Sequence, residues 1–136
     1  MGASFLSGVP GTHHAEAVIE AVAAGDATEE QVIFVAPFDC ILESVSITAD
    51  AAVTGNNTNT KNLNVVNKGS AGVGSTELAN LDLATGTDLV AADEKSLGTV
   101  ASNTLAEGDV VALEIEKVGT GVAIPRSVMR VGFRSQ

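Results

Sequence analysis

Residues 31–68 read QVIFVAPFDCILESVSITADAAVTGNNTNTKNLNVVNK, and this stretch decides the fold. Residues 32–35 form a β-branched and aromatic run that Pro37 ends. Apolar and polar residues then alternate through 41–48, and after a polar loop the alternation returns at 62–65. A period of two residues is typical of a half-buried strand. Three adjacent runs of this kind predict consecutive strands of a β-domain.

The alternation in the second run also predicts which of its side chains face the core. Ile41, Val45 and Ile47 recur at even spacing on one face, with Glu43 among them. The opposite face is predicted to carry the hydroxyl side chains Ser44, Ser46 and Thr48.

Similar runs continue toward the C-terminus. They lie at 78–83, 89–92, 96–100, 110–116 and 128–134. In the last two, the apolar faces are predicted to carry Val111, Leu113 and Ile115, and then Met129, Val131 and Phe133. About eight or nine short strands at spacings of about 8–15 residues are typical of an all-β fold. We therefore expect an antiparallel β-sandwich, jelly-roll-like, or a barrel.

The N-terminal residues have a different composition. Residues 1–14, MGASFLSGVPGTHH, contain three glycines and a proline and no Asp, Glu, Lys or Arg, which gives neither a long helix nor a long strand. One interpretation is an extended arm that becomes ordered against another surface, with Phe5, Leu6 and Val9 as its apolar anchors. The other is a frayed terminus. With the first interpretation, the chain divides into an arm over 1–14 and a single β-sandwich domain over 15–136.

Residues 15–24, AEAVIEAVAA, are the most ambiguous segment. Alanine and glutamate favour a helix by composition. The alternative is a strand with Ala17, Ile19, Ala21 and Ala23 along one face. In a chain that is otherwise rich in β-signals, we prefer the strand.

Composition excludes several classes of function. The formal net charge of −10 repels phosphate backbones, so we expect no direct binding to nucleic acid. The chain has no Trp or Tyr and only four Phe, which argues against a stacking platform for bases or sugars. No stretch has the basic start of a secretion signal or approaches about 18 consecutive apolar residues. We therefore expect synthesis in a cytoplasm, without membrane insertion.

The charges are unevenly distributed along the chain. Residues 1–60 contain no Lys or Arg, whereas residues 126–136 contain Arg126, Arg130 and Arg134 and no acid. One interpretation is that these arginines meet acids of a neighbouring copy or partner. The other is an acidic, solubilising surface with a few balancing arginines.

No motif predicts catalysis, cofactor binding or a metal site. GSAGVGST at 69–76 has the glycines of a phosphate loop but Ser75 in place of its lysine, so a hairpin turn is the better interpretation. His13 and His14 are adjacent and lack the spaced companions of a metal site. The acids Asp82, Asp88, Asp93 and Glu94, from separate loops, could converge on a cation, but their spacing is not that of a calcium loop. We expect a protein that is not an enzyme and that has no cofactor.

Several turn and strand pieces of the chain resemble one protein family. They are Val35-Ala36-Pro37-Phe38, the stretches 59–69 and 72–79, Gly108-Asp109-Val110, and the stretch 117–121 before Pro125. Together they resemble the head decoration (cement, or auxiliary capsid) proteins of tailed bacteriophages over about residues 31–134. The first 30 residues take no part in this resemblance.

The resemblance implies a β-rich subunit, commonly a trimer, on the outer surface of the virion capsid. Its partners would be the major capsid protein and further copies of itself. The expected capsid or inter-subunit contacts are Phe5, Leu6 and Val9 in the arm and Arg126, Arg130 and Arg134 near the C-terminus. Rival hypotheses are a carbohydrate-binding or host-attachment module of a phage head or tail fibre, a small hydrolase, and a plain structural subunit of the shell or tail.

Overall fold

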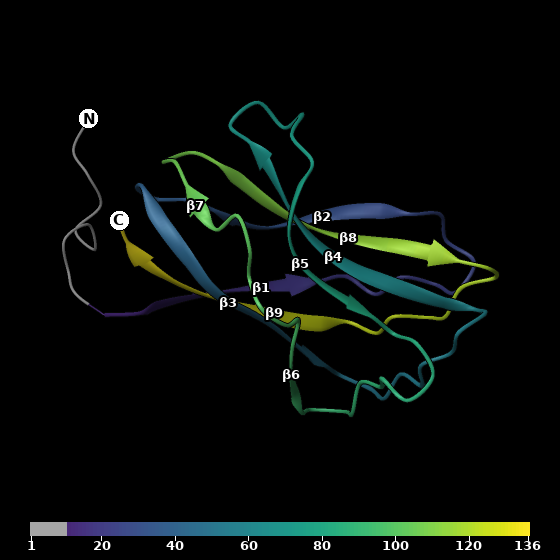
Figure 1. The fold of residues 1–136 in the computed structure, drawn as a ribbon. Coiled ribbons are helices and arrows are strands. Elements are labelled where there is room, and N and C mark those ends of the chain that lie inside the picture. The colour runs from purple at the N-terminus through teal and green to yellow at the C-terminus, as the bar shows by residue number, and fades with distance from the viewer. Residues whose placement is uncertain (1–10) are drawn as a thin grey trace.

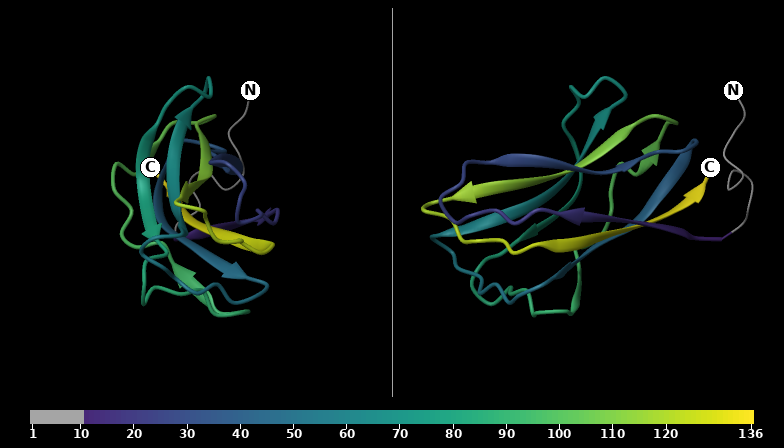
Figure 2. Two further views of the ribbon diagram at one scale, coloured as in Figure 1. Left: turned by 90° about the vertical axis from the view of Figure 1, so that its right-hand side faces the viewer. Right: turned by 180° about the vertical axis from the view of Figure 1, so that it is seen from behind.

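The chain folds into two antiparallel β-sheets that pack face to face, as Figures 1 and 2 show. The computed structural model describes residues 11–136. Within that range there is no helix, and so none that is long and apolar enough to span a membrane. The strands are β1 (His13–Ile19), β2 (Glu29–Val35), β3 (Cys40–Ala49), β4 (Thr60–Gly69), β5 (Thr76–Asp82), β6 (Glu94–Ser96), β7 (Thr104–Leu105), β8 (Val110–Val118) and β9 (Ser127–Ser135).

The strand order is that of a jelly roll. One sheet has the order β1-β9-β3-β6, with the short β7 also pairing with β3, and the other has the order β2-β8-β4-β5. Successive strands therefore cross from one sheet to the other, except at the β4–β5 hairpin and between the short β6 and β7. Eight strands wound in this way form the double-sheet arrangement of jelly rolls. The predicted all-β antiparallel sandwich is confirmed, and the glycine-rich stretch 69–76 lies in the β4–β5 hairpin, as predicted.

The core lies between the two sheets and consists almost entirely of aliphatic side chains. On β8, Val111, Leu113 and Ile115 are completely buried, as their alternation predicts. On β9, Met129 and Val131 are also completely buried. Such inward-facing residues of both sheets form one continuous cluster. Burial of this apolar area, at roughly 25 cal/mol per Å², is the main force that holds the sheets together.

A β-bulge in β3 makes one predicted face wrong. The register of β3 against β9 shifts between Leu42 and Ser44, so β3 carries an extra residue there. Leu42 and Val45 are therefore both buried, although they are an odd number of residues apart. Ile41 lies on the opposite face and is only half-buried, contrary to the even-spacing prediction. A bulge reverses the inward and outward alternation on one side of it, which residue types alone do not show.

The ambiguous segment 15–24 begins as a strand, as preferred, but its alternation does not continue to the end. β1 starts at His13, two residues before the predicted start of the domain at residue 15, and its inward face buries Ile19 completely. Beyond Ile19 the strand ends, and Val22 becomes the buried residue through an isolated bridge to Ile124. Ala21 and Ala23 are consequently exposed, so their predicted place on the inner face is wrong.

The sole cysteine lies at the end of the sandwich where β3 begins. Cys40 is completely buried and belongs to the same core cluster as Phe34, Phe38 and Phe133. The ring centroids of Phe34 and Phe133 are 4.9 Å apart, and those of Phe38 and Phe133 are 5.9 Å apart. Burial, together with the nearby negative charges of Asp39 and Asp109, raises the pKa of the Cys40 thiol from 9.0 to about 11. The thiol is therefore a small hydrophobic group of the core and a poor nucleophile.

This raised pKa predicts a loss of stability in alkali. Above pH 9 the unfolded chain releases the thiol proton, whereas the folded chain keeps it until about pH 11. The stabilisation is complete below pH 9 and falls by about 2–3 kcal/mol as pH rises to 11. Cys40→Ala should remove this loss. Urea denaturation at pH 8 to 11 measures it, and an unchanged slope in the variant would contradict the assignment.

Candidate functional site

The three predicted contact arginines lie along one outer face of the sandwich. Arg130 and Arg134 point outward from β9, and Arg126 immediately precedes that strand. Each forms an ion pair within its own chain: Arg126 Nη1 with Asp50 Oδ2 at 3.4 Å, Arg130 Nη1 with Glu94 Oε2 at 3.8 Å, and Arg134 Nε with Glu43 Oε2 at 3.2 Å.

Because of these ion pairs, the positive charges of the three arginines are balanced by acids of the same chain. The three arginine side chains remain about half exposed, at 44 to 54 per cent. Exposed pairs of this kind each contribute only about 0–1 kcal/mol to stability. The arginines thus balance acids of β3, β6 and the β3–β4 loop on the same face, which the sequence could not show because those acids are about 36 to 91 residues away. Their predicted role toward a neighbouring copy stays a prediction. Phe5, Leu6 and Val9 lie outside the described residues.

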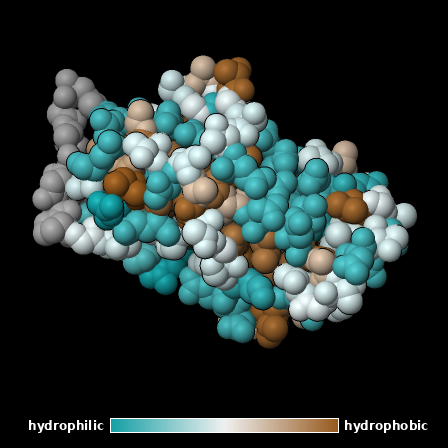
Figure 3. Space-filling view, viewed as in Figure 1, coloured by the Kyte–Doolittle hydropathy of each residue, from teal (hydrophilic) through white to brown (hydrophobic). Residues whose placement is uncertain are grey.

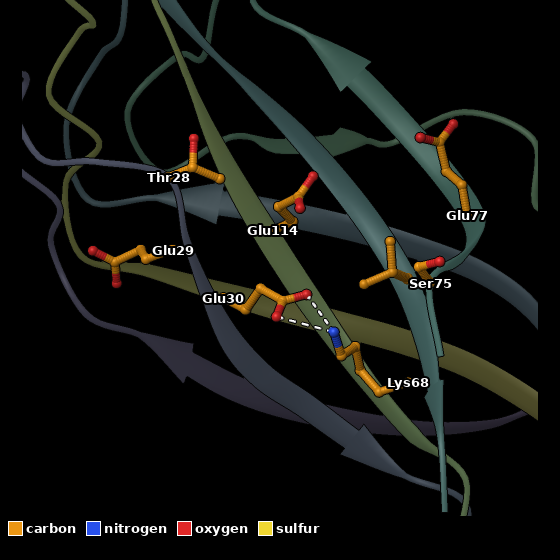
Figure 4. Close-up of a pocket in the computed structure, with 8 residues that line it drawn as sticks. Thr28, Glu29, Glu30, Lys68, Ser75, Glu77 and Glu114 are labelled. Carbon is orange, nitrogen blue, oxygen red and sulfur yellow. Dashed lines mark hydrogen bonds and ion pairs between the residues drawn. The ribbon is translucent and has the colours of Figure 1, made fainter. Parts of the chain in front are cut away.

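A polar cleft of about 400 Å³ lies on the outer face of the other sheet (Figure 4). Both carboxylate oxygens of Glu30, on β2, hold the Lys68 ammonium of β4, at 3.1 and 3.0 Å. Glu114 on β8 accepts a hydrogen bond from Asn64 Nδ2 at 2.9 Å. The residues that line the cleft are Thr28, Glu29, Glu30, Val66, Lys68, Ser75, Glu77 and Glu114.

The cleft continues into a ladder of amides and carboxylates across the sheet. Asn62 Nδ2 donates to Glu116 Oε1 at 3.2 Å, and Asn80 Nδ2 donates to Asp82 Oδ1 at 3.1 Å and to Asn64 Oδ1. Such oxygens are acceptors for hydroxyl groups or hard cations. Over residues 11–136, however, no three His, Cys, Asp or Glu side chains gather in a way that could hold a metal ion. What the cleft offers chemically is hydrogen bonding.

The acids that were considered from the sequence as a possible cation cluster make separate contacts in the structure. Asp88 Oδ1 accepts a hydrogen bond from the backbone N–H of Gly55 at 2.7 Å. Asp82 belongs to the ladder on β5, and Glu94 binds Arg130 and the hydroxyl of Ser46 on the opposite sheet. The two histidines also differ: His13 is half-buried, with its ring 5.7 Å from that of Phe133, whereas His14 is exposed.

An apolar groove of about 540 Å³ lies at one end of the sandwich, between three loops. These loops follow β1, follow β3 and precede β9, so the strand directions bring them to the same end. Val22 and Ile124 are almost completely buried beneath the groove and form its floor. Exposed alanines form the walls. The lining residues are Ala21, Val22, Ala23, Asp26, Ala51, Ala52, Ala123, Ile124 and Pro125.

The walls of the groove are fixed by backbone hydrogen bonds. Val22 and Ile124 exchange two of them, each 2.8 Å long. Asp26 closes the loop after β1, because its carboxylate accepts from the Ala23 N–H at 3.0 Å and its own N–H donates to the Ala23 carbonyl at 3.1 Å. The Asp50 N–H donates to the Arg126 carbonyl at 3.0 Å and ties the loop after β3 to the loop before β9. The groove is therefore pre-formed.

Lys61 supports the same loop from inside the protein. Its side chain, on β4, is completely buried, and its ammonium donates to the carbonyls of Ala23 at 3.0 Å and of Asp26 at 3.4 Å. Burial lowers the pKa of Lys61, while the charges of Asp26 and Glu29 partly offset that effect. A buried charge is costly unless it is bonded in this way.

Neither the groove nor the cleft was predicted from the sequence. The alanines of the groove lie in three loops that are far apart in the sequence, and only the jelly-roll order brings them together. An available signal was the excess of alanine over polar turn residues in these loops, at 51–52 and at 21–24. The cleft left a weaker signal in Asn62, Asn64 and Glu114, polar outward positions of strongly alternating strands.

Comparison of the chain with protein-family models, with curated proteins and with solved structures finds no match. The function of the chain is therefore inferred from the geometry of these surfaces and from its sequence.

Proposed function

We propose that this protein is a head decoration protein of a tailed bacteriophage. It would bind the outer surface of the capsid as an oligomer, bridge neighbouring capsomers and perform no reaction. The observation that carries the proposal is the apolar groove between the loops after β1, after β3 and before β9. A pre-formed apolar surface on a chain with a net charge of −10 is a protein-binding feature.

The physical properties of the groove suit binding to another polypeptide. Its walls are alanine methyl groups, and Asp26 is the one ionisable residue among those that line it. Contact energy there would come from apolar burial, at roughly 25 cal/mol per Å², and would change little with salt. The face in Figure 3 is mostly hydrophilic, with apolar residues in small separate patches. A hydrophilic face of this kind suits a subunit that must remain soluble before it docks.

The fold and the family resemblance support the same proposal. Jelly rolls occur in viral capsid and lectin domains, but a fold alone does not define a function. The pieces that resemble decoration proteins, including 59–69 and 117–121, lie on strands and turns of the sandwich. Several copies that bind together would also reach high avidity from weak single contacts.

Co-sedimentation with capsids tests the proposal. Heads that lack the protein, from the phage that encodes it, are mixed with the wild-type chain and with Ala52→Glu, which places a charge in the groove. We expect the wild type to pellet with the heads and the variant to lose at least about tenfold in affinity. Ala71→Glu, at an exposed alanine in the β4–β5 loop, is the matched control and should bind like the wild type. Absence of wild-type binding would refute the proposal.

The polar cleft favours one second candidate, a carbohydrate-binding module. Its carboxylate, amide and hydroxyl groups could bind sugar hydroxyls by hydrogen bonds, although the described lining contains no aromatic residue. A glycan array decides between the two: signals that Lys68→Ala abolishes would support this candidate, while an array without signals would remove it.

A further inference from the structure

We propose that the apolar groove binds residues 1–10 of a second copy of the chain, with Phe5, Leu6 and Val9 as the side chains that enter it. The inference rests on the proposed function in one respect, since it names another copy as the occupant of the groove in the oligomer. Ala52→Glu would then weaken capsid binding because the oligomer and its avidity are lost. It concerns the free protein in solution, however, and does not require a capsid.

The groove and the segment are complementary in shape and polarity. Small alanine side chains leave a hollow of about 540 Å³ over Val22 and Ile124, within the usual range of about 300–1,000 Å³ for binding pockets. The N-terminal segment supplies two large apolar side chains in succession, Phe5 and Leu6, and a third at Val9. Bulky side chains on one partner match small ones on the other.

Charge also favours this segment over other parts of a second copy. A chain with a net charge of −10 repels its own copies at long range. Residues 1–12 contain no acidic side chain, so they can approach an acidic neighbour without that repulsion. Asp26 is the one ionisable residue in the groove lining, and its carboxylate is already bonded to the Ala23 N–H.

The segment of the same copy cannot reach the groove. β1 starts at one end of the sandwich and runs toward the other end, as Figure 1 shows. The groove lies at that other end, where the loop after β1 meets the loop before β9. From Gly11 to Ala21 the chain spans ten residues, or roughly 30 Å at the rise of a strand. Phe5 is six residues before Gly11, which allows it at most about 22 Å of reach. The occupant must therefore come from another molecule.

This placement defines the type of assembly. The segment leaves one end of a copy and would enter the opposite end of the next, so the contact joins two different surfaces. Contacts of this head-to-tail kind form rings if the rotation between copies closes, and filaments if it does not. A closed ring of a few copies agrees with the trimer implied by the family resemblance.

Analytical ultracentrifugation of full-length variants tests the inference. Phe5→Asp combined with Leu6→Asp alters the segment, and Ala52→Glu alters the groove. Each should raise the dissociation constant of the oligomer by at least about a hundredfold, because apolar burial is lost. The matched controls are Ser4→Asp with Ser7→Asp, which adds the same charge to the segment, and Ala71→Glu; both should assemble like the wild type.

Mixing the two disrupted variants provides the decisive measurement. The segment variant retains an intact groove and the groove variant retains an intact segment, so together they should form a 1:1 complex that neither forms alone. A labelled peptide of residues 1–11 should also bind the segment variant, which keeps the inference testable if Ala52→Glu fails to fold. A wild-type chain that stays monomeric, or a segment variant that assembles like the wild type, would overturn the inference. Capsid binding by such a protein would leave the proposed function standing.

Discussion

Replacing Gly121 with alanine is expected to lower the free energy of unfolding by about 3–4 kcal/mol, a large effect for a residue in a loop. Gly121 has a φ of +78°, a conformation that side chains rarely adopt. A Cβ atom there would lie 2.0 Å from the carbonyl oxygen of Ala24 and 3.2 Å from Cε of Lys61. The first contact is with backbone, so the loop after β1 must move before alanine fits.

Alanine substitutions at two other glycines separate the two causes of this loss, the backbone strain and the close contact with Ala24. Gly108 has a φ of +89° but open space around its Cα, so Gly108→Ala should cost only the conformational strain, about 1 kcal/mol. Gly25 has neither the positive φ nor a close neighbour, and Gly25→Ala should be nearly neutral. Urea denaturation of the three variants gives the comparison. Equal losses in Gly121→Ala and Gly108→Ala would show that the close approach to Ala24 has no energetic weight.

Gly121→Ala is also expected to weaken binding at the groove. The loop after β1 supplies one wall of the groove, including Ala21 and Ala23. If alanine at position 121 displaces that loop, assembly and capsid binding should weaken even at temperatures where the variant remains folded. Gly108→Ala lies at the turn before β8, at the opposite end of the sandwich, and should not have this effect.

The regular strands were predictable from the sequence because the alternation of apolar and polar residues is visible within each strand. Alternation within 110–116 and within 128–134 identified the inward faces of β8 and β9, since each inward residue is two positions from the next. Ile41 was assigned to the wrong face because a bulge is a property of two paired strands, and one strand does not reveal it. Ala21 and Ala23 were assigned wrongly for a related reason: the bridge from Val22 to Ile124 ends the local pattern.

The surfaces were less predictable because they depend on the topology. The ion pairs of Arg130 and Arg134 join strands of one sheet that are far apart in the sequence. Lys61 follows a polar loop and reads as an exposed residue at a strand end, yet it is completely buried. The groove requires three loops to meet, and the excess of alanine in two of them does not show that they do. Composition did indicate a protein without nucleic-acid affinity, which remains a prediction.

Replacing Lys61 with alanine is expected to cost about 3–5 kcal/mol of stability. The substitution leaves a cavity where the buried aliphatic stem lies and removes the donor to the carbonyls of Ala23 and Asp26. Lys61→Met keeps most of the volume and should cost less, about 1–3 kcal/mol, because only the hydrogen bonds are lost. Lys117→Met is the control: Lys117 lies opposite Lys61 on β8, and its ammonium reaches the Gly25 carbonyl from the exposed side, at 3.4 Å.

The pH dependence of stability shows whether the buried Lys61 ammonium carries a desolvation cost. Burial lowers its pKa in the folded chain below the 10.5 of the unfolded chain, so between these two values the unfolded chain binds more protons. Stability must then rise with pH across that interval. The loss caused by Cys40 above pH 9 acts in the opposite direction, but it is common to the wild type and to Lys61→Met and cancels in their difference. The stability of the wild type relative to Lys61→Met should therefore increase as pH rises toward 10.5, measured by urea denaturation. A difference that is constant with pH would mean that the ammonium pays no desolvation cost inside the sandwich, and that the lysine supports the groove only through its volume and its hydrogen bonds.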